Sequence, residues 1–339
     1  MVSTTTTSTS SNRNLWQRLK DYFAYPTVRQ QRQVAMVLLI FQIGITVTGS
    51  IVRVTGSGLG CETWPNCHPG SLVPVEGMPG VHQFIEFGNR LLTFVVAAAS
   101  VAAVVVVHRA RRRSELKWYG WLSFALVVVQ AVIGGISVLI DLRWWAVALH
   151  FLPSMVLVWL AAMLYSRLKE PDDGKPTETF PGRIRILALL ANVALVIVLV
   201  TGTMVTGSGI HSGDAAISMD SRLQVNTEYM AIGHAICMYV YLALTIIAVY
   251  LLFLNHAPKA TKKAGVVLIA IIFMEWIIGV IQFRLGIPRW TVPAHVGMSG
   301  VVTAFSALLY AHGVKRVGAK KDWKSGSPEG DARRAEHFA

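Results

Sequence analysis

The sequence predicts an all-α integral membrane protein whose eight transmembrane helices form two tandem, pseudo-symmetric four-helix bundles. The composition predicts a membrane protein, because 53% hydrophobic and 14% charged residues are unusual for a water-soluble chain of 339 residues. Eight apolar blocks predict the helices, since each is close to the ~20 residues that span a bilayer, whereas barrel strands are short and alternating. The blocks cover residues 34–52, 83–107, 118–140, 145–165, 186–207, 229–254, 264–283 and 291–312.

The net charge of +13 reflects membrane topology rather than nucleic-acid binding. All but six of the 31 Lys and Arg residues precede the first block, follow the last or lie in alternate loops. The positive-inside rule therefore predicts cytoplasmic termini and places the opposite loops outside the cell membrane. These outer loops are residues 53–82, 141–144, 208–228 and 284–290.

Five segments follow from the apolar blocks and the charges. A cytoplasmic tail (1–33) begins with a Ser/Thr-rich stretch, residues 1–12, that has too little apolar content to fold. The first apolar block lacks the short hydrophobic region and small-residue cleavage site of a signal peptide, so we expect it to be an uncleaved membrane anchor. The remaining segments are the first bundle (34–167), a linker (168–185), the second bundle (186–312) and a second tail (313–339).

An internal repeat relates the two halves of the chain. An offset of 145 residues aligns WAVALHFLPSMVLVWLAAMLY with WTVPAHVGMSGVVTAFSALLY and pairs His150 with His295. The same offset pairs Gly134 with Gly279, and Asn89 with His234, while VTGSG after the first block recurs at 205–209. Four crossings return the chain to its starting side, so the two bundles are expected to lie parallel, side by side.

Polar residues recur at one depth in the even-numbered helices. Asn89, His150, His234 and His295 each lie one to two turns from the outer end, about 8–10 Å deep at 1.5 Å per residue. His234 and His295 are predicted to bind the two faces of one haem, because imidazoles on neighbouring helices are common axial ligands. A hydrogen bond between helices is the alternative for each histidine. Zinc is disfavoured, because no further donor cluster accompanies them.

The first half carries a different polar set. Asn89 is a poor iron ligand, and it shares one helix face with His82 and Glu86. His82 is either a replacement ligand or a solvated histidine at the membrane interface. Glu86 is either a group that exchanges protons or half of an ion pair with Arg90 four residues on. An altered site that contains a carboxylate is where we predict chemistry.

Three cysteines and one further carboxylate complete the candidates. Cys61 and Cys67 lie in CETWPNC of an outer loop, where oxidising conditions favour a disulfide that is either structural or redox-active. Cys237 is expected to be a packing residue. Glu275, matched by Gln130 in the first half, is interpreted as a buried hydrogen-bonding group between helices.

Five motifs together resemble the haem A synthase family over residues 34–312. They are RVTGSGLGCETWPNC, IEFGNR, ALHFLPS, GHA and AHVGMSG. The resemblance implies oxidation of a ring methyl of haem O to a formyl group, giving haem A for cytochrome c oxidase. It implies haem b between His234 and His295 as cofactor, substrate haem O in the first half, Glu86 as the functional carboxylate and His150 as a substrate-haem ligand.

This chain departs from the family pattern at one site residue. The family has a histidine where this sequence has Asn89, which leaves His150 alone or with His82 as ligands, near Arg90. The cysteine pair of the family falls on Cys61 and Cys67, and the second large outer loop lacks a pair. Besides haem O and lipid, the expected partners are haem O synthase, oxidase assembly factors and further copies of this chain.

Two other functions use the same histidines. A membrane cytochrome b would pass electrons from quinol to an outer acceptor, and a haem carrier would bind haem reversibly without chemistry. Formation of a formyl haem from haem O would distinguish the enzyme from both.

Overall fold

The computed structural model describes residues 14–75, 80–210 and 221–318. Its described residues contain eight helices that are long and apolar enough to cross a membrane, as predicted. They are α2 (Val28–Val54), α3 (Gly80–Arg109), α4 (Ser114–Leu139), α5 (Trp144–Arg167), α6 (Gly182–Ser208), α7 (Thr227–Leu254), α8 (Lys259–Arg284) and α9 (Thr291–Ala311).

Local sequence signals fix several helix ends. Thr27 and Gln30 form a reciprocal capping box, so α2 begins at Val28 rather than at residue 34, where the predicted apolar block begins. Asn226 accepts hydrogen bonds from the backbone N–H groups of Glu228 and Tyr229 at the start of α7. Gly286 follows α8 with φ of 72°, a left-handed conformation that glycine adopts without steric cost.

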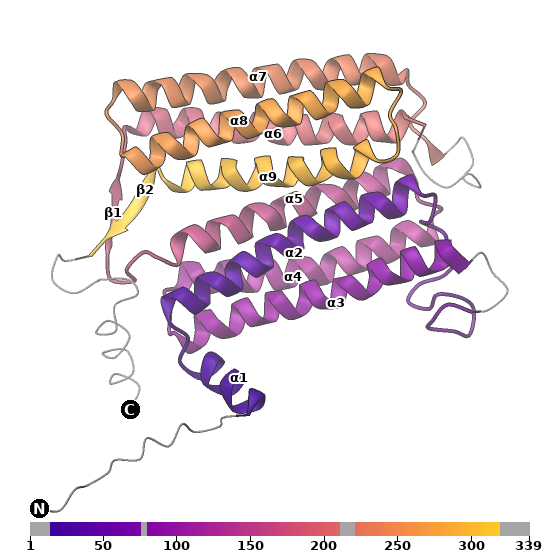
Figure 1. Ribbon diagram of the computed structural model, residues 1–339, viewed down its shortest axis with the longest axis horizontal. Coiled ribbons are helices and arrows are strands. Elements are labelled where there is room, and N and C mark those ends of the chain that lie inside the picture. Colours follow the sequence, from indigo (N-terminus) through magenta and orange to yellow (C-terminus); the bar gives the residue numbers. More distant parts are fainter. Residues whose placement is uncertain (1–13, 76–79, 211–220, 319–339) are drawn as a thin grey trace, which may run out of the picture.

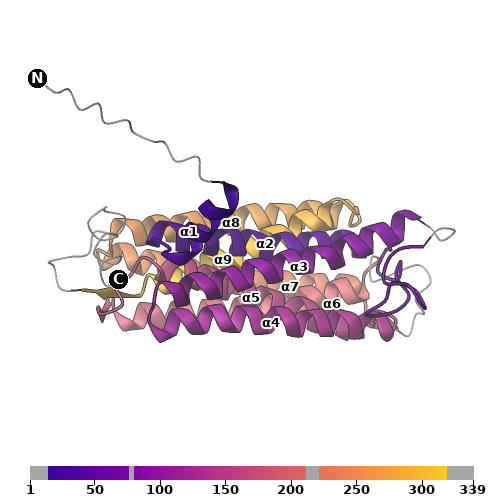
Figure 2. The ribbon, with the colours of Figure 1, turned by 90° about the horizontal axis from the view of Figure 1, so that it is seen from below.

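The eight long helices run side by side in two groups (Figure 1). Helices α2 to α5 lie together in the lower part of the view, and α6 to α9 lie together in the upper part. Figure 2 shows the same elongated bundle from below. In Figure 1 the connection between α5 and α6 lies at one end of the bundle, which we call the linker end, and the segment after α2 lies at the other, which we call the loop end.

Small residues allow α2 and α9 to approach across the two groups. A Cβ on Gly300 would lie 3.2 Å from side-chain atoms of Ile43, and one on Gly297 would lie 2.9 Å from Val47. Such close backbone approach is the usual way for helices to pack in a membrane, where van der Waals contact replaces the hydrophobic effect. A core of buried alanines continues the contact, with Ala35, Ala103, Ala161 and Ala307 in one cluster.

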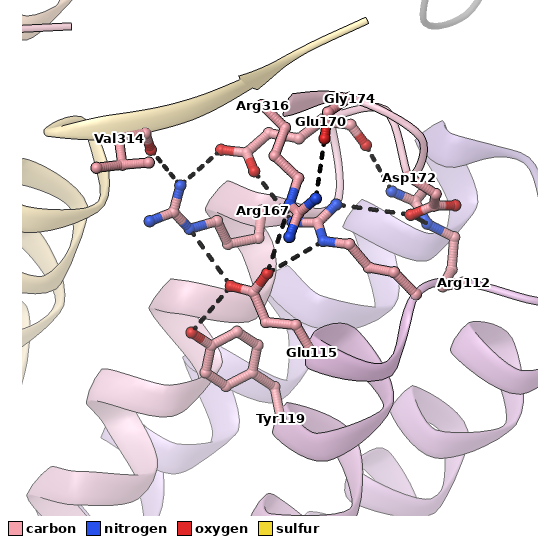
Figure 3. A network of polar contacts seen from close by, with 10 residues as sticks. Arg112, Glu115, Tyr119, Arg167, Glu170, Asp172, Gly174, Val314 and Arg316 are labelled. Atoms are coloured by element: carbon pink, nitrogen blue, oxygen red, sulfur yellow. Dashed lines mark hydrogen bonds and ion pairs between the residues drawn. The ribbon is translucent and has the colours of Figure 1, made fainter. Parts of the chain in front are cut away.

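A buried ionic network closes the linker end (Figure 3). The Arg112 side chain has no exposed surface; Nε donates to Asp172 Oδ1 at 3.0 Å, and Nη2 donates to the carbonyl of Glu170 at 2.8 Å. Arg167 Nη1 contacts Glu170 Oε1 at 2.8 Å and the carbonyl of Val314. These bonds tie the loop after α3 to the segment that joins the two halves.

Three short elements differ from the predicted tails and linker. Helix α1 (Leu15–Ala24) and the first turn of α2 lie within the predicted tail 1–33. Strand β1 (Lys175–Glu178) pairs antiparallel with β2 (Val314–Val317), with Lys175 opposite Val317. The two strands are held by the hydrogen bonds between them and not by burial of apolar side chains. Their sequences therefore show no apolar alternation that would predict a strand. Residues 1–12 and the tail beyond residue 318 lie outside the described residues.

Candidate functional site

Two histidines of the second group face each other. His234 on α7 and His295 on α9 have ring centres 6.3 Å apart and ring planes at 76°. Two imidazoles on opposite sides of one metal have centres about 6 Å apart, because each metal–nitrogen bond is about 2 Å and each nitrogen lies about 1 Å from its ring centre. The structure therefore brings the two predicted ligands together at a spacing that fits one metal.

The Nδ1 atoms of both histidines face protein oxygens. His234 Nδ1 lies 3.0 Å from the carbonyl oxygen of Val198 and 3.1 Å from Thr201 Oγ1, while His295 Nδ1 lies 3.2 Å from Glu275 Oε1. A carbonyl acceptor places the proton of His234 on Nδ1, which leaves Nε2 with a free lone pair. Neither Nε2 has a hydrogen-bond partner within the described ranges. For His234 this is the arrangement of a metal-binding histidine, whose second nitrogen is hydrogen-bonded to an oxygen. Nδ1 of His295 lies 3.2 Å from the Glu275 carboxylate but makes no hydrogen bond among the described residues.

A haem iron fits this pair better than a bare metal ion. A porphyrin supplies four equatorial nitrogens, so the protein needs to provide only two axial ligands. Across the described part of the chain, no group of three or more His, Cys, Asp and Glu side chains is close enough to hold a metal ion. The donor set of His234 and His295 thus matches a group that brings its own remaining ligands.

A glycine of the preceding helix supports each of three histidine rings. The distance from an added glycine Cβ to the imidazole Cε1 is 3.0 Å for Gly134 with His150, 3.2 Å for Gly202 with His234 and 3.4 Å for Gly279 with His295. A side chain at Gly134 or Gly202 would press on the ring, and a Cβ at Gly279 would lie in van der Waals contact with it. Residues matched by the sequence repeat therefore have matched surroundings, which indicates that His150 occupies a ligand-like position in the first group.

The position of Asn89 on α3 repeats that of His234 on α7. Thr48 Oγ1 donates to Asn89 Oδ1 at 2.8 Å, just as Thr201 Oγ1 contacts His234 Nδ1. Both threonines precede a glycine, but a Cβ on Gly49 would meet no heavy atom of the described residues within 4 Å. The shorter asparagine therefore leaves the glycine surface uncovered.

The surroundings of His150 differ from those of His295. Gln130, which stands where Glu275 stands in the second half, donates from Nε2 to the carbonyl of His150 at 2.7 Å and to Ser154 Oγ at 2.5 Å. Among the described residues, Nδ1 of His150 is buried without a hydrogen-bond partner. Nδ1 of His295 also makes no hydrogen bond there, but it has the Glu275 carboxylate at 3.2 Å, and Gln130 stands at the equivalent position beside His150.

Glu86 and Arg90 form an ion pair that also holds the disulfide loop. Arg90 Nη2 lies 2.5 Å from Glu86 Oε1, and the backbone N–H of Cys61 donates to Glu86 Oε2 at 2.8 Å. Arg90 also donates to the carbonyl oxygens of Thr63 and Asn66 at 3.0 and 3.2 Å. The carboxylate is buried, and both its oxygens are hydrogen-bonded, so the ion pair, one of the two roles considered for Glu86, is present.

The predicted cysteine pair is a disulfide between Cys61 and Cys67, and Cys237 packs at the edge of a core cluster as expected. His82 is exposed, and its Nδ1 lies 2.9 Å from Ser57 Oγ. Together with Glu86 and Asn89, His82 lies on the side of α3 that faces α2 and the loop after it.

Sequence reasoning missed three residues that seat this loop. Trp64 packs so closely on α4 that any side chain at Gly135, the neighbour of Gly134, would collide with its indole ring. His68 is buried and its Nε2 lies 3.0 Å from Oε1 of Gln83. Gln83 Oε1 also accepts from the backbone N–H of Val75, and Gln83 Nε2 donates to the Val75 carbonyl. Gln83 lies one turn before Glu86 on the same helix face, and this spacing was the available signal.

Comparison with known proteins assigns the family. The COX15-CtaA family model, described as cytochrome oxidase assembly protein, matches residues 32–307. The chain belongs to this family. It is 30% identical over 251 residues to the protein named Heme A synthase of Lysinibacillus sphaericus, covering 69% of this chain and 75% of that protein.

Two further relatives of the same name align over shorter spans. The Exiguobacterium sibiricum protein is 30% identical over 51% of this chain and 60% of its own. That of Geobacillus thermodenitrificans is 31% identical over 33% of this chain and 35% of its own. The residues matched by the family model include every candidate named above, from Thr48 to His295.

Proposed function

We propose that this protein is a haem A synthase that oxidises the ring methyl of haem O to a formyl group, supplying haem A for cytochrome c oxidase. Membership of the cytochrome oxidase assembly family and relatives named Heme A synthase support a role in haem A biosynthesis. The observation that carries the proposal is the histidine pair, 6.3 Å apart, with both Nδ1 atoms facing oxygens and both Nε2 atoms free to bind iron.

The eight apolar helices indicate a multi-pass membrane protein. We infer that α2–α5 and α6–α9 form two pseudo-symmetric bundles with cytoplasmic termini, because most Lys and Arg residues lie at the linker end. The disulfide at the loop end supports an extracytoplasmic position for the candidate sites.

In the second bundle, His234 and His295 would hold haem b. When bound, such a haem supplies one-electron transfer to the neighbouring bundle. Val198 and Thr201 orient the ring of His234, and Glu275 lies against the ring of His295, so neither imidazole needs to reorganise. Oε2 of Glu275 is buried without a partner in the described residues, a costly arrangement that a functional role for this carboxylate explains.

In the first bundle, His150 would hold the iron of substrate haem O. Glu86 then contributes a negative charge fixed by Arg90 and by the N–H of Cys61. A charge held in this way suits stabilisation of positive charge developing at the methyl carbon better than it suits proton transfer, because both carboxylate oxygens are engaged. Trp64, packed over Gly135, covers the neighbouring part of α4 with an apolar ring and helps to exclude water.

The proposal is tested in cells that make haem O and lack another haem A synthase. Wild-type protein should give haem A, whereas Glu86→Gln should retain haem b and yield at least ~100-fold less, a loss typical of removing a preorganised electrostatic group. Glu228→Gln is the matched control, because Glu228 is exposed in the first turn of α7. Unchanged haem A from the Glu86 variant would remove this residue from the mechanism, and no haem A from wild type would refute the function.

A further inference from the structure

We propose that Asn89 makes the first bundle an open haem site, in which His150 is the only protein ligand of the iron and the amide of Asn89 faces a position for a small exogenous ligand. This inference rests on the proposed function, because it requires haem in the first bundle. It assigns to Asn89 a positioning role toward a sixth ligand rather than the role of an iron ligand.

The first step is that Asn89 and His234 are equivalent in space as well as in sequence. Each is held by the threonine of a Thr-Gly pair on the preceding helix, Thr48 at 2.8 Å and Thr201 at 3.1 Å. Asn89 therefore stands where the second bundle has an axial ligand.

The second step is that asparagine cannot replace that ligand. An amide nitrogen carries no free lone pair, and the side chain is shorter than an imidazole. The consequence is visible at the glycines: the ring of His234 lies 3.2 Å from the Cβ position of Gly202, but no heavy atom of the described residues lies within 4 Å of the Cβ position of Gly49. The first bundle thus has no imidazole at the position equivalent to His234.

The third step concerns the orientation of the amide. Thr48 Oγ1 carries one proton and has two acceptors in reach, Oδ1 of Asn89 at 2.8 Å and the carbonyl oxygen of Ile45 at 3.1 Å. Donation to the nearer oxygen, Oδ1, directs the Nδ2 group of Asn89 away from that bond. Nδ2 has no hydrogen-bond partner among the residues that the structure describes. Two N–H donors are therefore available to a polar ligand on this side.

The fourth step excludes His82, the other histidine of α3, as the missing ligand. It lies seven residues before Asn89, about 10 Å nearer the loop end by helical rise. Its side chain is exposed, and Nδ1 is engaged by Ser57 at 2.9 Å.

Carbon monoxide tests the proposal on the purified, dithionite-reduced protein loaded with haem O. Wild type should bind one carbon monoxide for every two haems, because the His234–His295 haem has no open position. Asn89→His should restore an imidazole, abolish carbon monoxide binding and add a second low-spin spectrum. Asn89→Leu should still bind carbon monoxide, with a higher C–O stretching frequency and about tenfold faster dissociation, as expected for loss of one hydrogen bond. His82→Ala should match wild type.

The outcomes separate this inference from the proposed function. A second haem in wild type that is six-coordinate and inert to carbon monoxide would overturn the open site and leave the synthase proposal standing. A carbon monoxide complex unchanged by Asn89→Leu would overturn the role of the amide. Binding of haem b alone, with no haem retained by the first bundle, would overturn both.

Discussion

Replacing Glu275 by Gln removes the negative charge that faces His295 and should raise the midpoint potential of the haem b that we propose between His234 and His295 by about 100 mV. Glu275 Oε1 lies 3.2 Å from His295 Nδ1. The ring adds about 2 Å and the metal bond about 2 Å more, which puts the carboxylate charge roughly 7 Å from the iron. At an effective dielectric constant of about 20, this charge contributes roughly 2.4 kcal/mol, or about 100 mV for a one-electron couple.

Redox titration of the purified protein, followed at the haem b absorbance band, measures this shift. The carboxylate favours the more positive ferric state, so its loss raises the potential. Glu228→Gln serves as the control, because Glu228 is exposed, and solvent and salt should limit its effect to less than about 20 mV. A shift below about 20 mV in the Glu275 variant, or a lowered potential, would refute the argument that this carboxylate acts on the iron through His295.

Two further pairs of substitutions test the ionic network at the linker end and the packing of the proposed ligand His234. Arg112→Met should destabilise the protein by about 1–3 kcal/mol, seen as a lower thermal midpoint in detergent, because the buried Glu170 carbonyl and Gln31 Oε1 lose their donor. Asp172 is 28% exposed and keeps Arg113 at 3.5 Å, so its loss is smaller. Arg316→Met should cost less than about 1 kcal/mol, since its ion pair is partly exposed and long; equal losses would contradict the network. Gly202→Val should displace the ring of His234 and lower the amount of haem b bound to the purified protein. Gly49→Val should leave the haem b content unchanged, because a Cβ there meets no described heavy atom within 4 Å. Equal haem b contents in the two variants would contradict the packing argument.

The spanning helices were predictable because their signal is local. Length and apolar content alone define a membrane helix, and all eight predicted blocks fall on observed helices. The ends were less accurate, since a capping box such as that of Thr27 and Gln30 extends a helix into polar sequence. Helix α1 was missed because its ten residues are amphipathic and stand in a polar tail.

The linker-end network could not be predicted from the chain. Arg112 lies in a basic run whose only visible property in sequence is its charge, which topology rules assign to the cytoplasmic side. Its buried side chain contacts Asp172 and Gln31, which are 60 and 81 residues away. Contacts of this kind depend on how the two halves pack, and no local pattern encodes them.

The candidate site was predictable where the repeat constrains it. The repeat offset of 145 residues pairs Asn89 with His234 from the sequence alone, and in the structure each of the two residues contacts a threonine. The offset does not pair these threonines, Thr48 and Thr201, because they are 153 residues apart, a spacing altered by loop length. The seating of Trp64 was hidden for a different reason, because an irregular loop has no periodicity to read.

The central claim, conversion of haem O in this protein, is tested most directly by mass analysis of the haem extracted from purified protein made with and without a haem O supply. The account predicts haem b in both samples and hydroxylated or formylated haem only in the second. Haem b alone in both, from an assay shown to detect haem A, would contradict it and identify the chain as an electron-transferring cytochrome b.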